Sequence, residues 1–133
     1  MSVLLMRVLF ICAVAAFPAL PAAASEALGT WLSPPDGKGQ TGHVEVKACG
    51  AALCGTLVRA YDPNGVQITT ANVGKRLIWD MKSAGGGAYE GGRAFVPVLG
   101  AAFGATMQVK GSTLVVRGCA GPVCKSQTWQ RVR

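Results

Sequence analysis

The sequence has few of the residues on which enzyme chemistry usually depends. It contains one histidine, His43, and six acidic residues, so a second histidine for a metal pair is absent. No Gly-x-Ser-x-Gly nucleophile motif occurs. The glycine run at residues 85–87 is not followed by the Lys-Ser or Lys-Thr of a phosphate-binding loop. These absences exclude the common hydrolase and nucleotide-binding motifs, and an enzyme would have to use Asp80, Glu90 or His43.

The chain also lacks any long segment with apolar residues at helical spacing. Short β-type runs instead alternate with turn signals such as Pro-Pro-Asp-Gly at 34–37 and Asp-Pro-Asn-Gly at 62–65. We expect strands over residues 28–32, 43–48, 55–61, 66–70, 76–81, 88–96, 102–109, 113–117 and 126–132. Eight or nine short strands predict an all-β fold, either a small antiparallel β-barrel or a strongly curved sheet, because closure removes exposed edges.

The N-terminus has the three parts of an export signal over residues 1–24. A positive charge precedes an apolar run at 8–20, and small residues end the segment at Ala24. The run is short for a membrane anchor, which is the alternative, and prolines interrupt it. We therefore expect cleavage near Ala24 and removal of Cys12 with the signal. A single periplasmic or secreted domain over residues 25–133 would remain.

Acidic residues are absent after Glu90, whereas six cations follow it. These cations are Arg93, Lys110, Arg117, Lys125, Arg131 and Arg133. A basic second half suits an anionic membrane surface, a polyanion or an acidic ligand, and ordinary solvated strand faces are the alternative. We expect no nucleic-acid partner, because the chain is predicted to be exported.

Four cysteines form two copies of one spacing, Cys49 with Cys54 and Cys119 with Cys124. An even set of cysteines in a small exported chain indicates disulfides. Pairing within each motif would join facing residues of a hairpin, with turns at 50–53 and 120–123, and would contribute roughly 2 kcal/mol per bridge. Linking one motif to the other is the alternative connectivity. A four-thiolate zinc site is disfavoured because structural zinc uses tighter spacings.

Two tryptophans and an arginine near the chain ends predict a closed end of the barrel. Trp31 on the first strand would plug this end, and Arg131 on the last strand would lie over its indole ring. Such a cation–π contact contributes about 0.5–2 kcal/mol. Trp129 lies two residues from Arg131 and therefore shares its face of the strand.

The remaining aromatic side chains are candidates for a ligand pocket. They are Tyr61, Trp79, Tyr89, Phe95 and Phe103. Trp79 is expected to point inward together with Leu77 and Met81, which share its face of a regular strand. Simple packing is the alternative, because a small barrel is filled by its own side chains.

Five sequence blocks carry a resemblance to a known family. They are Gly-Thr-Trp at 29–31, Val-Glu-Val-x-x-Cys-Gly-x-x-Leu-Cys-Gly at 44–55, Tyr-x-Gly-Gly-x-x-Phe-x-Pro at 89–97, Leu-x-Val-Arg-Gly-Cys at 114–119 and Gln-Thr-Trp-x-Arg-Val at 127–132. In this order they resemble the bacterial secreted family called domain of unknown function 2147. The resemblance implies an envelope protein with a lipocalin-like β fold and supplies no catalytic residue. The segment 98–103 departs from the family pattern.

These observations together predict an exported, non-catalytic binding module for a small or amphipathic envelope molecule, such as a lipid-like ligand. No cofactor or metal is expected. A structural or interaction protein with a filled core and a basic contact face is the second hypothesis. An enzyme using the carboxylates or the histidine named above is the third.

Overall fold

The computed structural model describes residues 12–16 and 26–133, and within them the fold is all-β. The nine strands are β1 (Gly29–Leu32), β2 (Thr41–Cys49), β3 (Ala52–Tyr61), β4 (Gln67–Ile68), β5 (Arg76–Gly85), β6 (Ala88–Val96), β7 (Ala101–Lys110), β8 (Thr113–Ala120) and β9 (Val123–Arg131). Each expected strand corresponds to one of them. Within the described ranges, no helix is long and apolar enough to cross a membrane.

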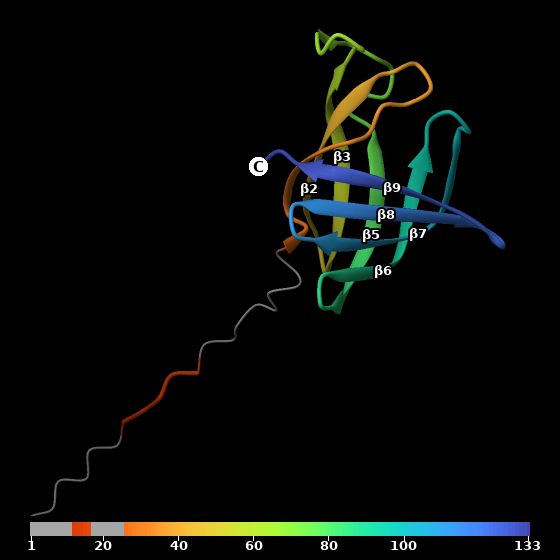
Figure 1. Cartoon of the computed structure of the whole chain (residues 1–133). Helices are drawn as coiled ribbons and strands as arrows, with labels where there is room; N and C mark the ends of the chain where they lie inside the picture. The colour runs from red at the N-terminus through yellow and green to blue at the C-terminus, as the bar shows by residue number, and fades with distance from the viewer. Residues whose placement is uncertain (1–11, 17–25) are drawn as a thin grey trace, which may run out of the picture.

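Eight of the strands close into an antiparallel barrel. Their order is β2-β1-β9-β8-β7-β6-β5-β3, and pairing of β2 with β3 completes the ring. The short β4 extends the sheet beside β3. Figure 1 shows β8 and β9 crossing in front of the steeper β3 and β5, so the barrel consists of two roughly orthogonal layers. The prediction of a closed or strongly curved antiparallel sheet is confirmed.

The hairpins are tighter than the sequence predicted. Only Gly50 and Ala51 separate β2 from β3, and only Gly121 and Pro122 separate β8 from β9. Both glycines have a positive φ, 66° and 58°, at the first turn position, as type II′ hairpin turns require. Residues 52–53, 120 and 123, where the sequence had suggested turns, therefore belong to strands.

The barrel core fills the middle of the structure and one of its ends. Its largest fully buried side chains are Trp31, Tyr89, Ile78, Met81, Leu114, Val44 and Val46. Burial of one such aliphatic side chain contributes about 1.5–3 kcal/mol. The interior is so full beside Gly55 that an added Cβ would come within 2.8 Å of Cγ1 of Ile78.

A sharp bend in β5 and β6 corrects one prediction about the interior. Ile78 and Met81 are both fully buried, although three positions separate them. Asp80 between them has a φ of 55°, and β5 has one residue more than β3 between these two positions, as in a β-bulge. Trp79 therefore does not share the face of Met81. It lies opposite Arg93 of β6 on the outer face of the sheet and is half-buried there.

Candidate functional site

One end of the barrel, called the narrow end here, is closed by Trp31 and the segment before β1. The Trp31 Nε1–H donates a hydrogen bond of 2.9 Å to the Ala27 carbonyl oxygen, and neither residue is exposed to solvent. The guanidinium carbon of Arg131 lies 4.2 Å from the Trp31 ring centroid. Arg131 also donates hydrogen bonds to the carbonyl oxygens of Leu28, at 2.9 Å, and Glu26. These contacts hold residues 26–28 and the end of β9 over the narrow end.

Trp129 lies inside the barrel beneath this closure. It is 3% exposed and is opposite Leu114 in the β8–β9 register. Its Nε1–H donates a hydrogen bond of 3.0 Å to Oε1 of Gln127, which occupies the preceding inward position of β9. The inner face of β9 therefore carries a buried indole at Trp129 and a polar side chain at Gln127, toward the start of the strand.

Beyond Trp129, toward the opposite or wide end, inward positions become open to solvent. The β8–β9 register has no irregularity, so Gln127 and Lys125 follow Trp129 on the inner face. Lys125 lies opposite Gly118, and Gly118 lies opposite Ala105 of β7. Both Gln127 and Lys125 are nevertheless exposed. Water therefore reaches the inner side of β9 at the wide end, where Gly118 of β8 is half-buried and Ala105 of β7 is buried.

The surroundings of the glycines support this difference between the two ends. A Cβ added to Gly118 would meet only one heavy atom within reach, the Gly104 carbonyl oxygen at 4.0 Å. By contrast, a Cβ on Gly92 would come within 2.9 Å of the Met81 Cε and still closer to its sulfur. The interior is thus packed around Gly92 and open beside Gly118.

We call this region the open inner face. Its members are Phe103, Ala105, Gly118, Lys125 and Gln127, of which Ala105 is buried. It combines a half-buried aromatic ring and small apolar groups with one ammonium and one amide. That chemistry suits a molecule with an apolar body and an acidic or hydrogen-bonding head. Among the residues that the structure describes, no cluster of histidine, cysteine or carboxylate side chains is arranged to hold a metal ion.

The five aromatic residues proposed for a pocket are not brought together. Tyr89 is buried in the core at 1% exposure, and burial raises the pKa of its hydroxyl. Phe103 lies on the open inner face. The other three lie on the outer face, where Trp79 is opposite Arg93, Tyr61 lies against His43 and the Lys75 ammonium lies 5.6 Å from the Phe95 ring centroid. Of the five, only Phe103 lies on the open inner face.

The cysteines are paired within each motif. Cys119 and Cys124 are directly opposite each other, with their Cα atoms 4.1 Å apart. Cys49 and Cys54 are joined diagonally, because the two-residue turn places Cys54 opposite Lys47. Their Cα atoms are 5.8 Å apart. The expectation of facing residues is thus correct for the second hairpin and wrong for the first.

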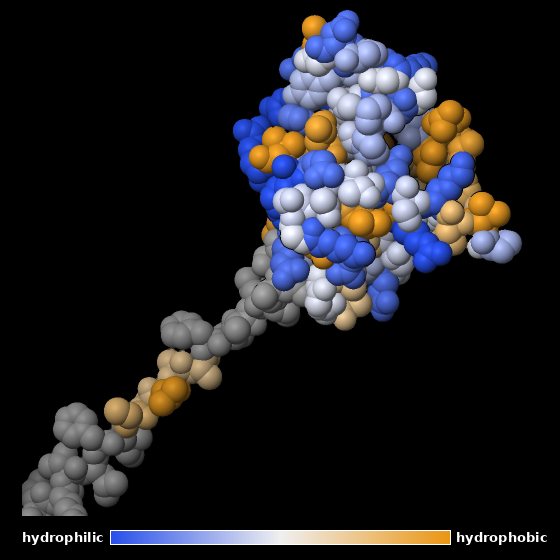
Figure 2. Space-filling model, in the orientation of Figure 1, coloured by the Kyte–Doolittle hydropathy of each residue, from blue (hydrophilic) through white to orange (hydrophobic). Residues whose placement is uncertain are grey.

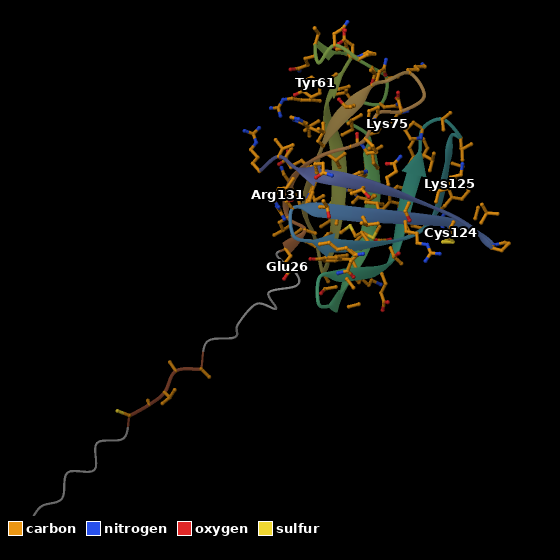
Figure 3. All side chains as sticks on the ribbon, in the orientation of Figure 1. Glu26, Tyr61, Lys75, Cys124, Lys125 and Arg131 are labelled. Carbon is orange, nitrogen blue, oxygen red and sulfur yellow. A yellow bond between two sulfur atoms is a disulfide. The ribbon has the colours of Figure 1, made fainter. Side chains whose placement is uncertain are left out.

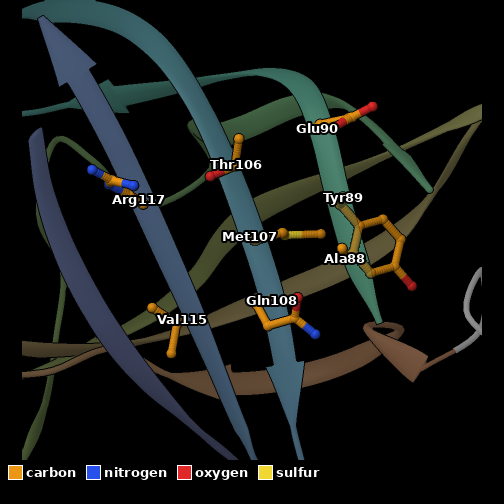
Figure 4. A pocket seen from close by; sticks show the side chains of 8 residues that line it. All are labelled: Ala88, Tyr89, Glu90, Thr106, Met107, Gln108, Val115 and Arg117. Atoms are coloured by element: carbon orange, nitrogen blue, oxygen red, sulfur yellow. The ribbon is translucent and has the colours of Figure 1, made fainter. Parts of the chain in front are cut away.

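Two shallow grooves lie elsewhere on the structure. One, of about 220 Å³, is lined mainly by outward side chains of β6, β7 and β8, including Glu90, Thr106 and Arg117 (Figure 4). The other, of about 330 Å³, lies between Glu26 and Arg131 at the narrow end. Both are open grooves, and the first combines one acid and one base with the neutral side chains of Thr106 and Gln108.

The three residues considered for catalysis do not form one site. His43 lies on the outer face of β2, with its ring centroid 4.9 Å from that of Tyr61 and its Nδ1 3.4 Å from the tyrosine hydroxyl. Partial burial lowers the pKa of His43, and the charges of Arg59 and Arg133 lower it further. Asp80 and Glu90 lie near the bend of the β5–β6 pair, but Glu90 is directly opposite Lys82 rather than Asp80.

Side chains of the open inner face could have been found from the sequence by counting backwards. If Trp129 points inward, strict alternation along β9 places Gln127 and Lys125 on the same side. Figure 3 shows Lys125 near the disulfide-bonded end of the β8–β9 hairpin, marked by Cys124. The sequence offered no signal that this part of the barrel is left open.

Comparisons with known proteins agree with this fold. The family model described as "Uncharacterized protein conserved in bacteria (DUF2147)" matches residues 29–131. A solved structure from Helicobacter pylori, protein HP1028, which is described as belonging to the lipocalin family, is similar with a TM-score of 0.64. The two chains are 15% identical, and the match covers 80% of this chain and 82% of that one. No curated protein matches the chain.

Proposed function

The chain belongs to the DUF2147 family of bacterial proteins, and we propose that it is a non-catalytic binding module that holds a small amphipathic molecule at the open inner face. The observation that carries this proposal is the exposure of Lys125 and Gln127 at positions that face the barrel interior. In a barrel that is closed and filled at both ends, inward side chains would be buried and not exposed to solvent. A binding site at one open end accounts for both properties.

The lipocalin-like fold supports the proposal in a general way. The mouths of small β-barrels are among the places where proteins bind small molecules, because the rim provides polar groups and the interior provides apolar walls. Here the apolar walls are Phe103 and Ala105, and the polar groups are Lys125 and Gln127. The ammonium of Lys125 favours a ligand with a negative head.

The packed core sets a limit on the size of the ligand. Met81, Ile78 and Trp31 are 0–1% exposed and fill the barrel between the wide end and the closure. A long acyl chain cannot pass through these side chains without rearranging a close-packed interior. The proposed ligand is therefore short, or binds with only part of its length between the strands.

Decanoate and decanol provide a direct test, since they share an apolar chain and differ in charge. We expect the disulfide-bonded domain over residues 25–133 to bind decanoate, as measured by native mass spectrometry and by quenching of tryptophan fluorescence from Trp129. Lys125→Gln should weaken decanoate binding about two- to fivefold, the range of an exposed ion pair, and leave decanol binding unchanged. Lys110→Gln is the matched control, because Lys110 is an exposed lysine at the end of β7, at the narrow end.

Gly118→Leu separates the site from general hydrophobic binding. The leucine would occupy the space that the inner face leaves beside Gly118 and should weaken the binding of both probes. If neither probe binds, or if Gly118→Leu binds both as the parent does, the open inner face is not the site.

An interaction protein is the second candidate, because the centre of the barrel is filled by its own side chains. For this candidate, the basic strands would contact an anionic partner and the open inner face would stay empty. Its binding would weaken steeply as salt is added, whereas binding of decanol would not.

We also infer export to the periplasm or outside the cell, with cleavage near Ala24. Both disulfides and the bacterial family are consistent with an exported protein. The proposed signal lies mostly outside the described residues. Sequencing the N-terminus of the protein from a periplasmic extract tests this inference, and an intact Met1 would contradict it.

A further inference from the structure

Two hairpin turns at the wide end carry exposed apolar side chains. Val98 and Leu99 in the β6–β7 turn are 89% and 64% exposed, and Val123 at the start of β9 is 63% exposed. We call these three residues the apolar tips. Figure 2 shows apolar surface over both turns on the right-hand side of the molecule, separated by polar surface. The adjacent strands β7 and β8 connect the two turns within one sheet.

The composition of the β6–β7 turn is unusual for a turn in water. Residues 96–101 contain no charged or hydrogen-bonding side chain, whereas solvated turns usually carry asparagine, aspartate or serine. The turn is nevertheless well formed, because Leu99 and Gly100 donate backbone hydrogen bonds to the Val96 carbonyl oxygen at 3.0 and 2.9 Å. Its backbone is satisfied while its two large side chains project outward. Val98 and Leu99 are adjacent and have no polar neighbour in the turn, so they form an apolar patch of the kind that marks a contact surface.

Charge indicates what this surface contacts. Arg93, Arg117 and Lys125 lie on the strands behind the tips, and no acidic residue follows Glu90 in the sequence. All three cations are exposed. A protein partner would need one continuous apolar patch, but here the apolar side chains are divided between two turns. A lipid surface can accept separate apolar side chains and bind the neighbouring cations through its phosphates.

We propose that the wide end of the barrel docks on an anionic phospholipid bilayer. The apolar tips enter the boundary between headgroups and acyl chains, and Arg93, Arg117 and Lys125 contact the lipid phosphates. In this orientation the open inner face lies beside the membrane. Arg93, Arg117 and the apolar tips are not members of the open inner face, and only Lys125 belongs to both sites. The docking needs no bound ligand, so it can hold or fail independently of the proposed binding function.

Sedimentation with vesicles tests the docking. The disulfide-bonded domain over residues 25–133 is mixed with vesicles of phosphatidylglycerol and phosphatidylcholine, and separately with phosphatidylcholine alone. We expect it to bind the anionic vesicles and to be released by salt. The double variant Val98→Ser and Leu99→Ser should lower the partition coefficient about tenfold or more, given the transfer free energy of the two side chains. Val123→Ser should cause a smaller loss.

Matched controls separate docking from non-specific hydrophobic adsorption and from misfolding. Val132→Ser removes an exposed valine at the opposite end of the barrel and should leave binding unchanged. Arg117→Gln should weaken binding to anionic vesicles while leaving decanoate binding intact. Equal sedimentation of the parent and the Val98→Ser, Leu99→Ser variant overturns the proposal, and so does equal binding to neutral and anionic vesicles. The thermal unfolding midpoint of each variant verifies that it is folded.

Discussion

Two glycines on the inner face provide the sharpest test of how the interior is divided. We predict that alanine at Gly55 destabilises the protein and that alanine at Gly118 stabilises it. Both glycines lie within strands and neither has a positive φ, so backbone strain does not distinguish them. The expected difference comes from what the new methyl group meets.

At Gly55 the methyl group would lie 2.8 Å from Cγ1 of Ile78 and 3.0 Å from Cγ1 of Val44. Both neighbours are fully buried and β-branched, so they have few alternative rotamers. Overpacking of this kind costs about 1–3 kcal/mol. Gly92 is a weaker choice for the test, because its neighbour Met81 is flexible and can move aside.

At Gly118 the added methyl group meets nothing closer than 4.0 Å. Alanine then restricts the unfolded chain without a clash in the folded one, which stabilises by about 0.4–1 kcal/mol. Urea unfolding with both disulfides intact would measure the two changes. A shift of 1 kcal/mol moves the thermal midpoint of a domain this size by about 4–8 °C, so differential scanning calorimetry resolves the signs as well. Loss of stability for Gly118→Ala comparable to that for Gly55→Ala would show that the inner face is packed at both positions.

Three further outcomes follow from the closure, the disulfides and the histidine. Arg131→Lys should lower the unfolding free energy by about 1–3 kcal/mol, because lysine cannot cover Trp31 and bond two carbonyl oxygens at once; an unchanged urea midpoint would contradict the closure. Replacing Cys119 and Cys124 together with alanine should cost roughly 2 kcal/mol by the loop-closure argument, and unchanged stability of the double variant would contradict it. Folding lowers the pKa of His43 below the ordinary histidine value of 6.5, so near and below pH 6.5 the unfolded chain binds more protons than the folded one. The free energy of unfolding should therefore fall as the pH drops through 6.5. His43→Gln should flatten this part of the pH–stability curve, and an identical slope in parent and variant would remove His43 as its source.

Much of the fold could be predicted because turn chemistry and β-type composition mark the strands one by one. The strand β6 was predicted with the bounds that the structure has, Ala88–Val96, because glycines precede it and a proline follows it. The cysteine hairpins were harder. A glycine at Gly50 allows a two-residue turn, and the shorter turn moves Cys54 out of line with Cys49. A change of turn length by two residues thus changes which residues face each other.

The inward positions were predicted less well where a strand is irregular. Period-two alternation placed Trp79 with Met81, but Asp80 adds a residue and reverses the alternation. Aspartate accepts a positive φ more readily than most residues, yet the residue type alone does not show that it will do so. Residue type alone groups the five aromatic residues as pocket candidates, but it does not show which face of its strand each one occupies. On the regular strand β9, alternation from Trp129 correctly places Gln127 and Lys125 on the inner face.

The open inner face has a structural cause in the shortness of β1. This strand contains four residues, and within the described chain it pairs with β9 only at Trp31 with Arg131 and Leu32 with Gln130. Two prolines at 34–35 follow soon after, and proline cannot donate a hydrogen bond to extend the ladder. The earlier half of β9 is therefore bonded only to β8, so the barrel closes tightly around Trp31 and opens along Lys125 and Gln127. Such a free edge invites pairing with another chain, and the inward lysine and the Cys119–Cys124 disulfide are features that hold the hairpin in its own register. The shortness of β1 thus accounts for the closed end, for the exposed inward side chains of β9 and for a disulfide at the far end of the β8–β9 hairpin.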